Sequence, residues 1–405
     1  MRLRFRTSFE GPGAGRAPEP LRRFGGLGPE PARAALTLAL VALGSVVPAE
    51  GREASAEWPS FRGNSELTGI ARGSLPEEPQ VLWTFEAEGG VESTAAIVGE
   101  RVFVGSMDGI FYALSLGDGR ELWTYDAGEA IRSSPLVAGG VAYFGDEAGY
   151  VHAVDAATGK GRWKFEAQGE VTSSPNLAGG CVLVGSFDQF LYCLDPASGE
   201  VRWKVETEGP VNGSPAVSGD EVISAGCDGF LRSVHLEDGK EVSKVALGGY
   251  VAAGAAVRGS RAYVGSFENE VLALDLAKDE VLWRYRHPSR HFPFYGSAAV
   301  TGDTVVIAGR DKMIHALDAE SGAARWTHAT RARIDASPVI LGDRVFVGGE
   351  SGVFYALDLK SGKVRWEFET GSGLVASPAI ARDRMVLGTV DGTVYCWGAA
   401  PKRGK

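Results

Sequence analysis

Cysteine is scarce in this chain of 405 residues, with four copies: Cys181, Cys193, Cys227 and Cys396. No two of them are adjacent, and none forms a C-x-x-C or C-x-x-C-H motif. Nothing therefore signals a zinc ribbon or covalently attached haem. Cys181 and Cys193 fall on neighbouring strands of one expected hairpin, where they can form a disulfide if the register brings them together.

Basic residues are also in deficit. The chain has 41 Lys and Arg against 51 Asp and Glu, which gives a net charge of -10. Residues 1–49 hold seven Arg and three Glu, so the remainder carries about -14. Acidity of this size argues against nucleic acid or an anionic membrane surface as the main partner.

Long apolar runs are absent except for one, residues 34–47, which follows an Arg-rich stretch and ends in Val47-Pro48-Ala49. A basic stretch, an apolar run and small residues are typical of an export signal. We therefore predict that residues 1–49 are removed after Ala49 and that the protein is periplasmic or secreted. No Cys follows the run, so we expect no lipid anchor, and no later stretch is long enough to span a bilayer.

A repeated unit fills most of the chain. The stretch 344–366, RVFVGGESGVFYALDLKSGKVRW, returns along the sequence with an apolar run ending in Gly, a tight turn, a second apolar run, another turn and a Trp. Successive copies are 40 residues apart, except for one interval of 43. The final position of the unit reads Trp83, Trp123, Trp163, Trp203, Ser243, Trp283, Trp326 and Trp366.

A period near 40 built from short apolar runs predicts a β-propeller with four antiparallel strands per blade. In the last full copy we expect strands at 376–380 (inner), 345–348, 353–357 and 364–368 (outer), with Val364, Trp366 and Phe368 facing inward. Residues 81–85 form an outer strand without an inner triplet, and 374–397 an inner triplet without an outer strand. The fold class is therefore all-β, an eight-bladed propeller whose last blade is closed by the N-terminal strand. Seven blades with two loose ends is the alternative.

Domain boundaries follow from the repeats. We predict a lead-in segment at 50–80, anchored by Trp58 and Phe61, the propeller at 81–398 and a basic tail at 399–405. The Trp residues are expected to wedge between blades.

Two other columns of the repeat carry structural predictions. A turn column holds Gly in most copies, where a tight hairpin needs positive φ. Gln189 and Lys312 break this column, so we expect a different turn in those two hairpins. A small-residue column is expected near the crowded centre of the ring, and it reads Ala113, Ala153, Cys193, Ser233, Ala273, Ala316, Ala356 and Cys396.

The pattern S-P-x-V…V-x-V-G-S-x-D-G-x-x-Y-A-L-D-x-x-T-G-x-x-x-W resembles the PQQ-like β-propeller repeat. That repeat is shared by quinoprotein dehydrogenases and by BamB-type scaffolds of outer-membrane protein assembly. The lead-in Trp58 to Asn64, W-x-x-F-R-G-N, is similar to the opening of exported members. The resemblance covers residues 81–397, and it implies the fold without deciding between enzyme and scaffold.

Enzymatic features are missing. The resemblance to quinoprotein dehydrogenases implies adjacent cysteines over the cofactor and carboxylate or amide calcium ligands, but no adjacent cysteines occur and the constant pitch leaves no long insertions. The Asp residues of the turn column favour turn formation over metal binding. The serines of the S-P pairs recur with the repeat and are therefore predicted to be structural. We predict no catalytic residue, no metal and no cofactor, with PQQ and calcium as the alternative.

A candidate site comes from a column that varies while its neighbours stay fixed. Two residues before the S-P serine, the copies read Glu92, Arg132, Thr172, Asn212, Ala252, Tyr295, Asp335 and Val375. We expect these side chains to ring one mouth of the central channel, with Glu92, Arg132 and Asp335 able to pair. They form either a binding site or a solvated, salt-bridged rim.

A second candidate is the longer connection RYRHPSRHFPFYGS. Its cationic and aromatic residues are Arg284, Arg286, His287, Arg290, His291, Phe292, Phe294 and Tyr295. The loop either grips an acidic partner or ligand or packs on the blade tops. His287 and His291 are spaced for a metal ion only on a helix, and Pro288 disfavours one.

The sequence thus predicts an exported, non-catalytic, monomeric propeller that binds protein partners, in the manner of BamB-type scaffolds. The alternative is a PQQ-binding or other small-ligand-binding propeller, including a quinoprotein oxidoreductase.

Overall fold

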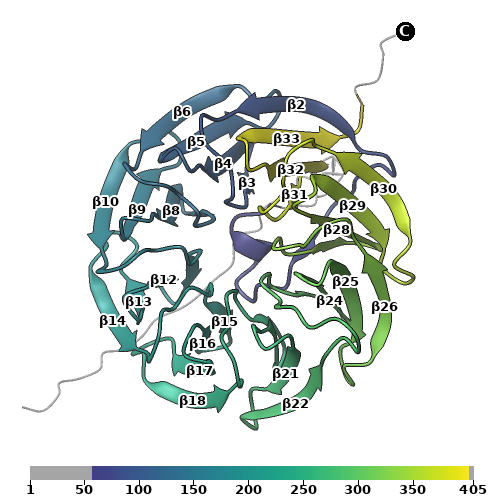
Figure 1. Ribbon diagram of the computed structural model, residues 1–405. Helices are drawn as coiled ribbons and strands as arrows, with labels where there is room; N and C mark the ends of the chain where they lie inside the picture. Colours follow the sequence, from purple (N-terminus) through teal and green to yellow (C-terminus); the bar gives the residue numbers. More distant parts are fainter. Residues whose placement is uncertain (1–56, 401–405) are drawn as a thin grey trace, which may run out of the picture. The chain divides into compact units, whose positions relative to one another are not determined.

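Eight sheets of antiparallel strands stand around a common axis in the computed structural model (Figure 1). The structure describes residues 57–400, so the predicted export signal and most of the predicted tail lie outside the described residues. Each sheet is one blade of four strands, running from the axis to the outer wall, and blade 7 gains a fifth strand. The prediction of eight blades is confirmed.

The blades follow one another in chain order, each with a short inner strand. Blades 1 to 4 consist of β3 (Ala96–Val98), β4 (Arg101–Gly105), β5 (Ile110–Ser115) and β6 (Glu121–Asp126); β7 (Leu136–Ala138), β8 (Val141–Gly145), β9 (Tyr150–Asp155) and β10 (Gly161–Glu166); β11 (Asn176–Ala178), β12 (Cys181–Gly185), β13 (Phe190–Leu194) and β14 (Val201–Glu206); β15 (Ala216–Ser218), β16 (Glu221–Ala225), β17 (Phe230–His235) and β18 (Glu241–Ala246).

Blades 5 to 8 repeat this order, except that the outer strand of blade 8 comes from the other end of the chain. They consist of β19 (Ala256–Arg258), β20 (Arg261–Gly265), β21 (Val271–Asp275) and β22 (Glu280–Tyr285); β23 (Ala299–Val300), β24 (Thr304–Gly309), β25 (Met313–Asp318) and β26 (Ala324–Ala329); β27 (Val339–Leu341), β28 (Arg344–Gly348), β29 (Val353–Asp358) and β30 (Val364–Glu369); β31 (Ala379–Ala381), β32 (Arg384–Gly388), β33 (Thr393–Gly398) and β2 (Gln80–Glu86).

Closure of the ring occurs as predicted. The early strand β2 pairs antiparallel with β33, from Gln80 opposite Gly398 to Glu86 opposite Thr393. The first and last parts of the propeller therefore share one sheet, and the edge of β33 is covered by β2.

The Trp column holds neighbouring blades together. The indole nitrogen of Trp326 donates a hydrogen bond to the carbonyl of Leu359 in the next blade (2.8 Å). Gly362, with φ of +69°, lies directly on the ring, since a Cβ there would stand 2.5 Å from an indole carbon. Trp83, Trp163, Trp203 and Trp283 repeat both contacts. The predicted wedge is thus a clamp that needs Gly in the next blade.

Two expectations about the outer strands and the turns need correction. Val364 is exposed, although it was expected to face inward, because a bulge shifts the register between Trp366 and Val364. Gln189 and Lys312 adopt φ of 74° and 65° and keep the turn used by the glycine copies. Each donates its N–H three residues back, as Gly109 does, so these non-glycine residues accept a left-handed backbone instead of changing the turn.

The small-residue column lies on the third strand of each blade and not at the centre of the ring, which corrects that prediction. Ala113 pairs with Trp123 across the ladder, and Ala356 pairs with Trp366. The residue is small because its cross-strand neighbour is the large indole. In blade 3 this position is Cys193, which forms a disulfide with Cys181.

The serines of the S-P pairs link the blades around the axis. The N–H of Ser134 donates to the hydroxyl of Ser174, and the same bond joins Ser337 to Ser377 in later blades. The series is interrupted at Gly254, where the serine is missing. The Trp is missing from the same junction, because blade 4 carries Ser243 there. The predicted structural role of these serines is confirmed, and the junction of blades 4 and 5 is the exception.

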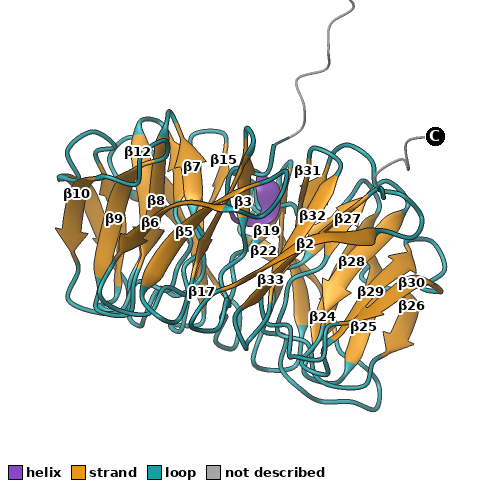
Figure 2. Cartoon of the chain, turned by 90° about the horizontal axis from the view of Figure 1, so that it is seen from above, coloured by secondary structure: helices purple, strands orange, loops and turns teal. Residues whose placement is uncertain are grey.

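The lead-in segment plugs one end of the channel (Figure 2). A single helical turn in its described part, η1 (Phe61–Gly63), sits on the axis, and β1 (Ile70–Ala71) pairs in parallel with β27. Carbonyls of this segment accept hydrogen bonds from the inner strands of blades 2, 4, 5, 6 and 7. The donors are the N–H groups of Val137, Val217, Val257, Val300 and Ile340. The inner edges of these blades are thereby satisfied.

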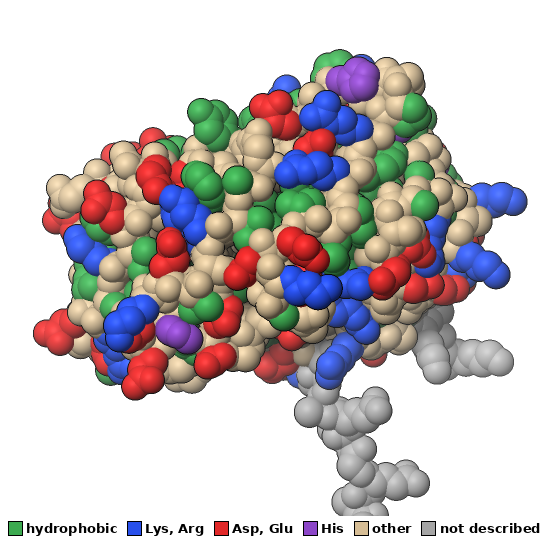
Figure 3. All heavy atoms as spheres, turned by 90° about the horizontal axis from the view of Figure 1, so that it is seen from below, with side chains coloured by type: hydrophobic (Ala, Val, Ile, Leu, Met, Phe, Trp, Pro, Cys, Tyr) green, Lys and Arg blue, Asp and Glu red, His purple; other side chains and the backbone are tan. Residues whose placement is uncertain are grey.

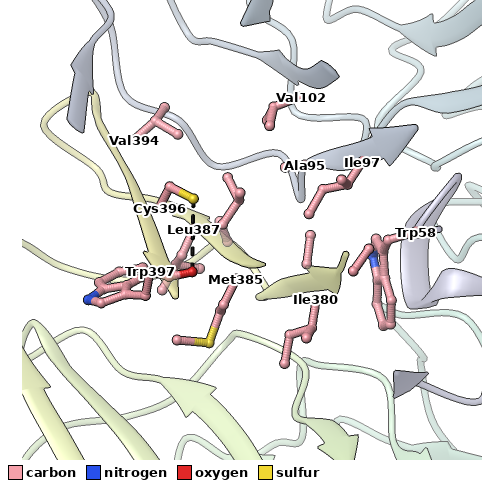
Figure 4. Packing of buried hydrophobic residues seen from close by; sticks show 14 of the residues in the cluster. Trp58, Ala95, Ile97, Val102, Ile380, Met385, Leu387, Val394, Cys396 and Trp397 are labelled. Atoms are coloured by element: carbon pink, nitrogen blue, oxygen red, sulfur yellow. Dashed lines mark hydrogen bonds between the residues drawn. The ribbon is translucent and has the colours of Figure 1, made fainter. Parts of the chain in front are cut away.

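The predicted anchor Trp58 is fully buried and bridges to Ile97 of blade 1. Figure 4 shows Trp58 beside Ile97 and Ile380, in a cluster that also holds Trp397 of the closing blade. Phe61, the second anchor, is half-buried against blades 4 and 5. On the outer wall, acidic and basic side chains are mixed (Figure 3).

No helix in residues 57–400 has the length and apolar character needed to cross a membrane.

Replacing Trp326 with Ala is expected to lower the free energy of unfolding by about 3 kcal/mol, because the clamp is lost and a cavity remains. Trp326→Phe keeps the ring on Gly362 and loses the hydrogen bond, so about 1 kcal/mol is expected. Urea denaturation measures both. Ser243→Ala, at the junction without a clamp, is the control and should change stability by less than about 0.5 kcal/mol. A loss below about 1 kcal/mol for Trp326→Ala would contradict the clamp.

Candidate functional site

The variable column converges on one cavity. The side chains of the column line a space of about 450 Å³ on the axis: Glu92, Arg132, Thr172, Asn212, Ala252, Tyr295, Asp335 and Val375. The column precedes the inner strands and does not begin them, since β27 starts four residues after Asp335. We call this space the cup. It opens on the mouth face, defined as the loops between successive blades together with the hairpins between second and third strands.

The part of the lead-in segment that closes the channel, which we call the plug, forms the floor of the cup. Phe61 lines the cup, and the adjacent Arg62 is completely buried. Its guanidinium donates to the carbonyls of Ala298 (3.0 Å) and Pro338 (2.6 Å), while Nε and Nη1 have no partner in the part of the chain that the structure describes. Burial lowers the pKa of Arg62 to about 9, so the side chain remains charged at neutral pH. Sequence reasoning missed this buried cation, because nothing in W-x-x-F-R-G-N distinguishes it from an exposed Arg.

Charged side chains of the wall pair with one another. Arg132 lies between Glu92 (3.6 Å) and Glu147 (2.5 Å), so the expected pairing of Glu92 with Arg132 occurs. Asp335 does not join them, because Arg310 of the nearer hairpin holds both of its carboxylate oxygens at 2.8 Å. This contact raises the pKa of Arg310. Among the charged side chains that line the cup, Glu170 is the one without an ion-pair partner in residues 57–400.

Asn212 also lines the cup, from the junction between blades 3 and 4. Its Oδ1 lies 3.8 Å from the free thiol of Cys227. Arg333, which the sequence reading did not single out, reaches the cup as well and pairs with Glu350 at 2.6 Å. Arg310 and Arg333 were missed because they lie outside the aligned column.

The longer connection is partly tied to the blades. Arg284 lies on β22, where it donates to Glu270 (2.7 Å) and to the carbonyl of Leu247 (2.8 Å), and Arg286 donates to the same carboxylate (2.8 Å). Arg290 donates to the carbonyl of Asp311 (2.7 Å). The Glu270 carboxylate thus pairs with two of the cations and offsets one of their two charges, whereas Arg290 has a backbone carbonyl as its partner.

The aromatic and histidine residues of this connection divide between core and surface. Phe294 is buried between blades 5 and 6, against Gly265 and Gly309, so its prediction as a stacking surface is wrong. The two missing side chains at those glycines make the space that the ring fills. Phe292 and Tyr295 are exposed, by 53% and 38%.

His287 contacts the ring of the buried His315, and desolvation lowers its pKa, whereas His291 is exposed. Among residues 57–400, no three His, Cys, Asp or Glu side chains are grouped so that they could hold a metal ion.

A closed ring of eight repeats with a polar cup defines a PQQ-like propeller. The family model described as outer membrane protein assembly factor BamB matches residues 75–149, 147–239, 227–331 and 291–400. The chain belongs to this family. A curated relative, the outer membrane protein assembly factor BamB of Xanthomonas campestris pv. campestris, is 36% identical over 75 residues, which is 18% of this chain and 17% of that protein. The alignment thus spans about a sixth of that relative.

Solved structures share the fold at low identity. BamB from Moraxella catarrhalis is 20% identical with a TM-score of 0.69, covering 79% of this chain and all of that one. Quinohemoprotein alcohol dehydrogenase from Comamonas testosteroni is 14% identical with a TM-score of 0.74, covering 86% and 82%. The same architecture therefore occurs in an assembly factor and in an enzyme.

Arg62→Met and Arg62→Ala should differ in stability by at least about 1 kcal/mol. Both remove the hydrogen bonds to Ala298 and Pro338, but Met fills the space and removes a charge that has no counter-charge. We expect Met within about 1 kcal/mol of wild type and Ala about 3 kcal/mol less stable. Equal urea midpoints for the two variants would show that the plug does not depend on the volume of this side chain.

Proposed function

We propose that this protein is an exported, non-catalytic propeller that binds protein partners through its mouth face, as a scaffold in cell-envelope or outer-membrane protein assembly. The observation that carries the proposal is a set of exposed aromatic side chains around a cup in which the charged side chains, apart from Glu170, are held in ion pairs. Tyr250, Phe292, Tyr295 and Phe187 are exposed on this face. Aromatic side chains at a partly exposed rim are typical of protein interfaces.

Membership in a family described as outer membrane protein assembly factor supports this role. The disulfide between Cys181 and Cys193 supports export, since such bonds persist in oxidising compartments. The pairing of β2 with β33 completes the eighth blade within one chain, so closure of the ring needs no strand from a second copy, which supports a monomer.

Oxidoreductase activity is the second candidate, because the fold is shared with a quinohemoprotein alcohol dehydrogenase. The residues that line the cup do not fit a quinone held by a calcium ion. Asp335 and Glu92 are engaged by arginines of the same wall, and no group of metal ligands occurs in the described part of the chain. We therefore derive no catalytic step through such a cofactor.

The contact face is tested by affinity capture from envelope extract of the source organism. Tyr250→Glu/Phe292→Glu places two charges on the mouth face and should reduce partner recovery at least fivefold. Val242→Glu/Val364→Glu is the matched control, because both valines are 43% exposed on outer strands. Equal recovery by the mouth variant, measured by quantitative mass spectrometry, would rule out this face.

Titration of the protein with PQQ and Ca²⁺ separates the two functions. We expect no saturable change in absorbance or fluorescence, because no group of metal ligands occurs in residues 57–400 and Glu92, Glu147 and Asp335 of the cup pair with arginines. Stoichiometric binding would reverse the order of the two candidates. Bovine serum albumin is a suitable control for nonspecific adsorption of the quinone.

A further inference from the structure

The mouth face is electrically polarised. The loops that join blades 8 to 1, 1 to 2 and 2 to 3 carry Glu88, Glu129 and Glu170, and all three are exposed. None of these carboxylates has an ion-pair partner within residues 57–400. This arc of the mouth face, which we call the acidic arc, therefore presents unneutralised negative charge.

Basic residues gather on the other side of the ring. The connection between blades 5 and 6 carries Arg290 and His291, the next loop carries Arg331 and Arg333, and the hairpin of blade 6 carries Lys312. We call these residues the basic arc. Arg290 donates to a backbone carbonyl and not to a carboxylate, and Lys312 is exposed with no side-chain partner among the described residues.

The two remaining arginines of the basic arc are paired but accessible. Arg331 pairs with Glu369, and Arg333 with Glu350, with side-chain exposures of 56% and 50%. Such surface pairs contribute little, so a partner can compete for these cations.

The acidic arc and the basic arc lie on opposite sides of the ring. In a ring of eight blades, the junction of blades 1 and 2 lies across from that of blades 5 and 6 (Figure 1). Glu129 therefore faces the loop of Arg290 and His291 across the cup, and Glu170 faces the loop of Arg331 and Arg333. Negative and positive charge therefore lie at opposite ends of a diameter of the mouth face.

Apolar side chains lie between the arcs. Phe187, Tyr250 and Phe267 occupy the hairpin of blade 3, the junction of blades 4 and 5, and the hairpin of blade 5. Phe267 contacts the ring of Tyr295 (5.9 Å between centroids), and the guanidinium of Arg310 lies 4.4 Å from the same Tyr ring. Phe187 and Tyr295 line the cup that separates the arcs, so a partner that bridges the arcs passes over these two rings.

We propose that the mouth face binds a protein segment with acidic side chains at one end, basic side chains at the other and apolar side chains between. This inference rests on the proposed function and specifies its partner. Because the eight blades are similar, a partner can dock on the ring in eight orientations that differ by rotation about its axis. The charge pattern favours one of these orientations. A half-turn of the partner places like charges together on both arcs, which is unfavourable and salt-dependent.

Fluorescence anisotropy with the full chain tests the inference. The probes are fluorescein-labelled 15-residue peptides of one composition: a bipolar peptide with three Glu, a central Leu-Trp-Leu block and three Lys, and a scrambled peptide with the charges interspersed. We expect the bipolar peptide to bind at least fivefold more tightly at about 50 mM salt and the preference to vanish near 0.5 M salt. Equal affinities at low salt, or binding of neither peptide, overturns the inference.

Charge reversal provides the matched variants. Glu129→Lys/Glu170→Lys and His291→Glu/Lys312→Glu alter exposed side chains without partners and should each abolish the preference for the bipolar peptide. Combining all four reverses the polarity and should restore the preference, because the peptide can bind in the opposite direction. Glu200→Lys/Glu237→Lys, on turns between third and outer strands, is the control and should behave as wild type.

The two proposals fail separately. If capture from envelope extract depends on Tyr250 and Phe292 but no variant discriminates between the peptides, the mouth face binds a partner without the charge pattern inferred here. Failure of the combined variant to recover the preference has the same meaning.

Discussion

The contact between an indole and a glycine in the next blade is the interaction on which the ring depends. A blade buries its two central strands only when it is covered on both faces, so no blade is stable alone. In six of the eight outer strands the Trp reaches the following blade, where Gly362 and its counterparts adopt positive φ and lie on the ring. Trp366 has no such glycine and instead packs against Trp397 of the closing blade. The clamp thus continues across the point where the chain ends meet.

The centre of the ring imposes a second requirement. Inner strands present one edge to the axis, and unpaired N–H groups there would be costly. The lead-in segment meets this requirement, because it passes from blade to blade and its carbonyls accept hydrogen bonds from the inner strands. The same segment closes one end of the channel, which turns a channel into a cup. Because Phe61 lines the floor, the cup opens toward the mouth face.

Most features that recur in the copies were predictable from the sequence, although the small-residue column was misplaced, whereas most features that occur once were not. The eight blades, the closing strand and the convergence of the variable column all follow from the period and its landmarks. Arg62 and Arg310 stand outside the repeat, so nothing in the pattern marked them. Phe294 was misassigned because its neighbours in the loop are exposed aromatics, and its burial depends on glycines 29 residues before and 15 residues after it. The path of the lead-in was hidden for a different reason: its contacts are with backbone amides, which every sequence has.

The pairing of β2 with β33 has a consequence for how the molecule is made. Glu86 and Thr393 meet in one sheet although they are 307 residues apart in the chain. At the usual speed of translation, about 5–20 residues per second, β2 waits roughly 15 to 60 s for its partner. During that time a strand of β-forming residues has an unpaired edge, open to neighbouring chains. Any factor that shields nascent polypeptides should therefore matter most for this segment, and shortening the wait, for example by circular permutation between blades 4 and 5, relocates that hazard to a new chain end.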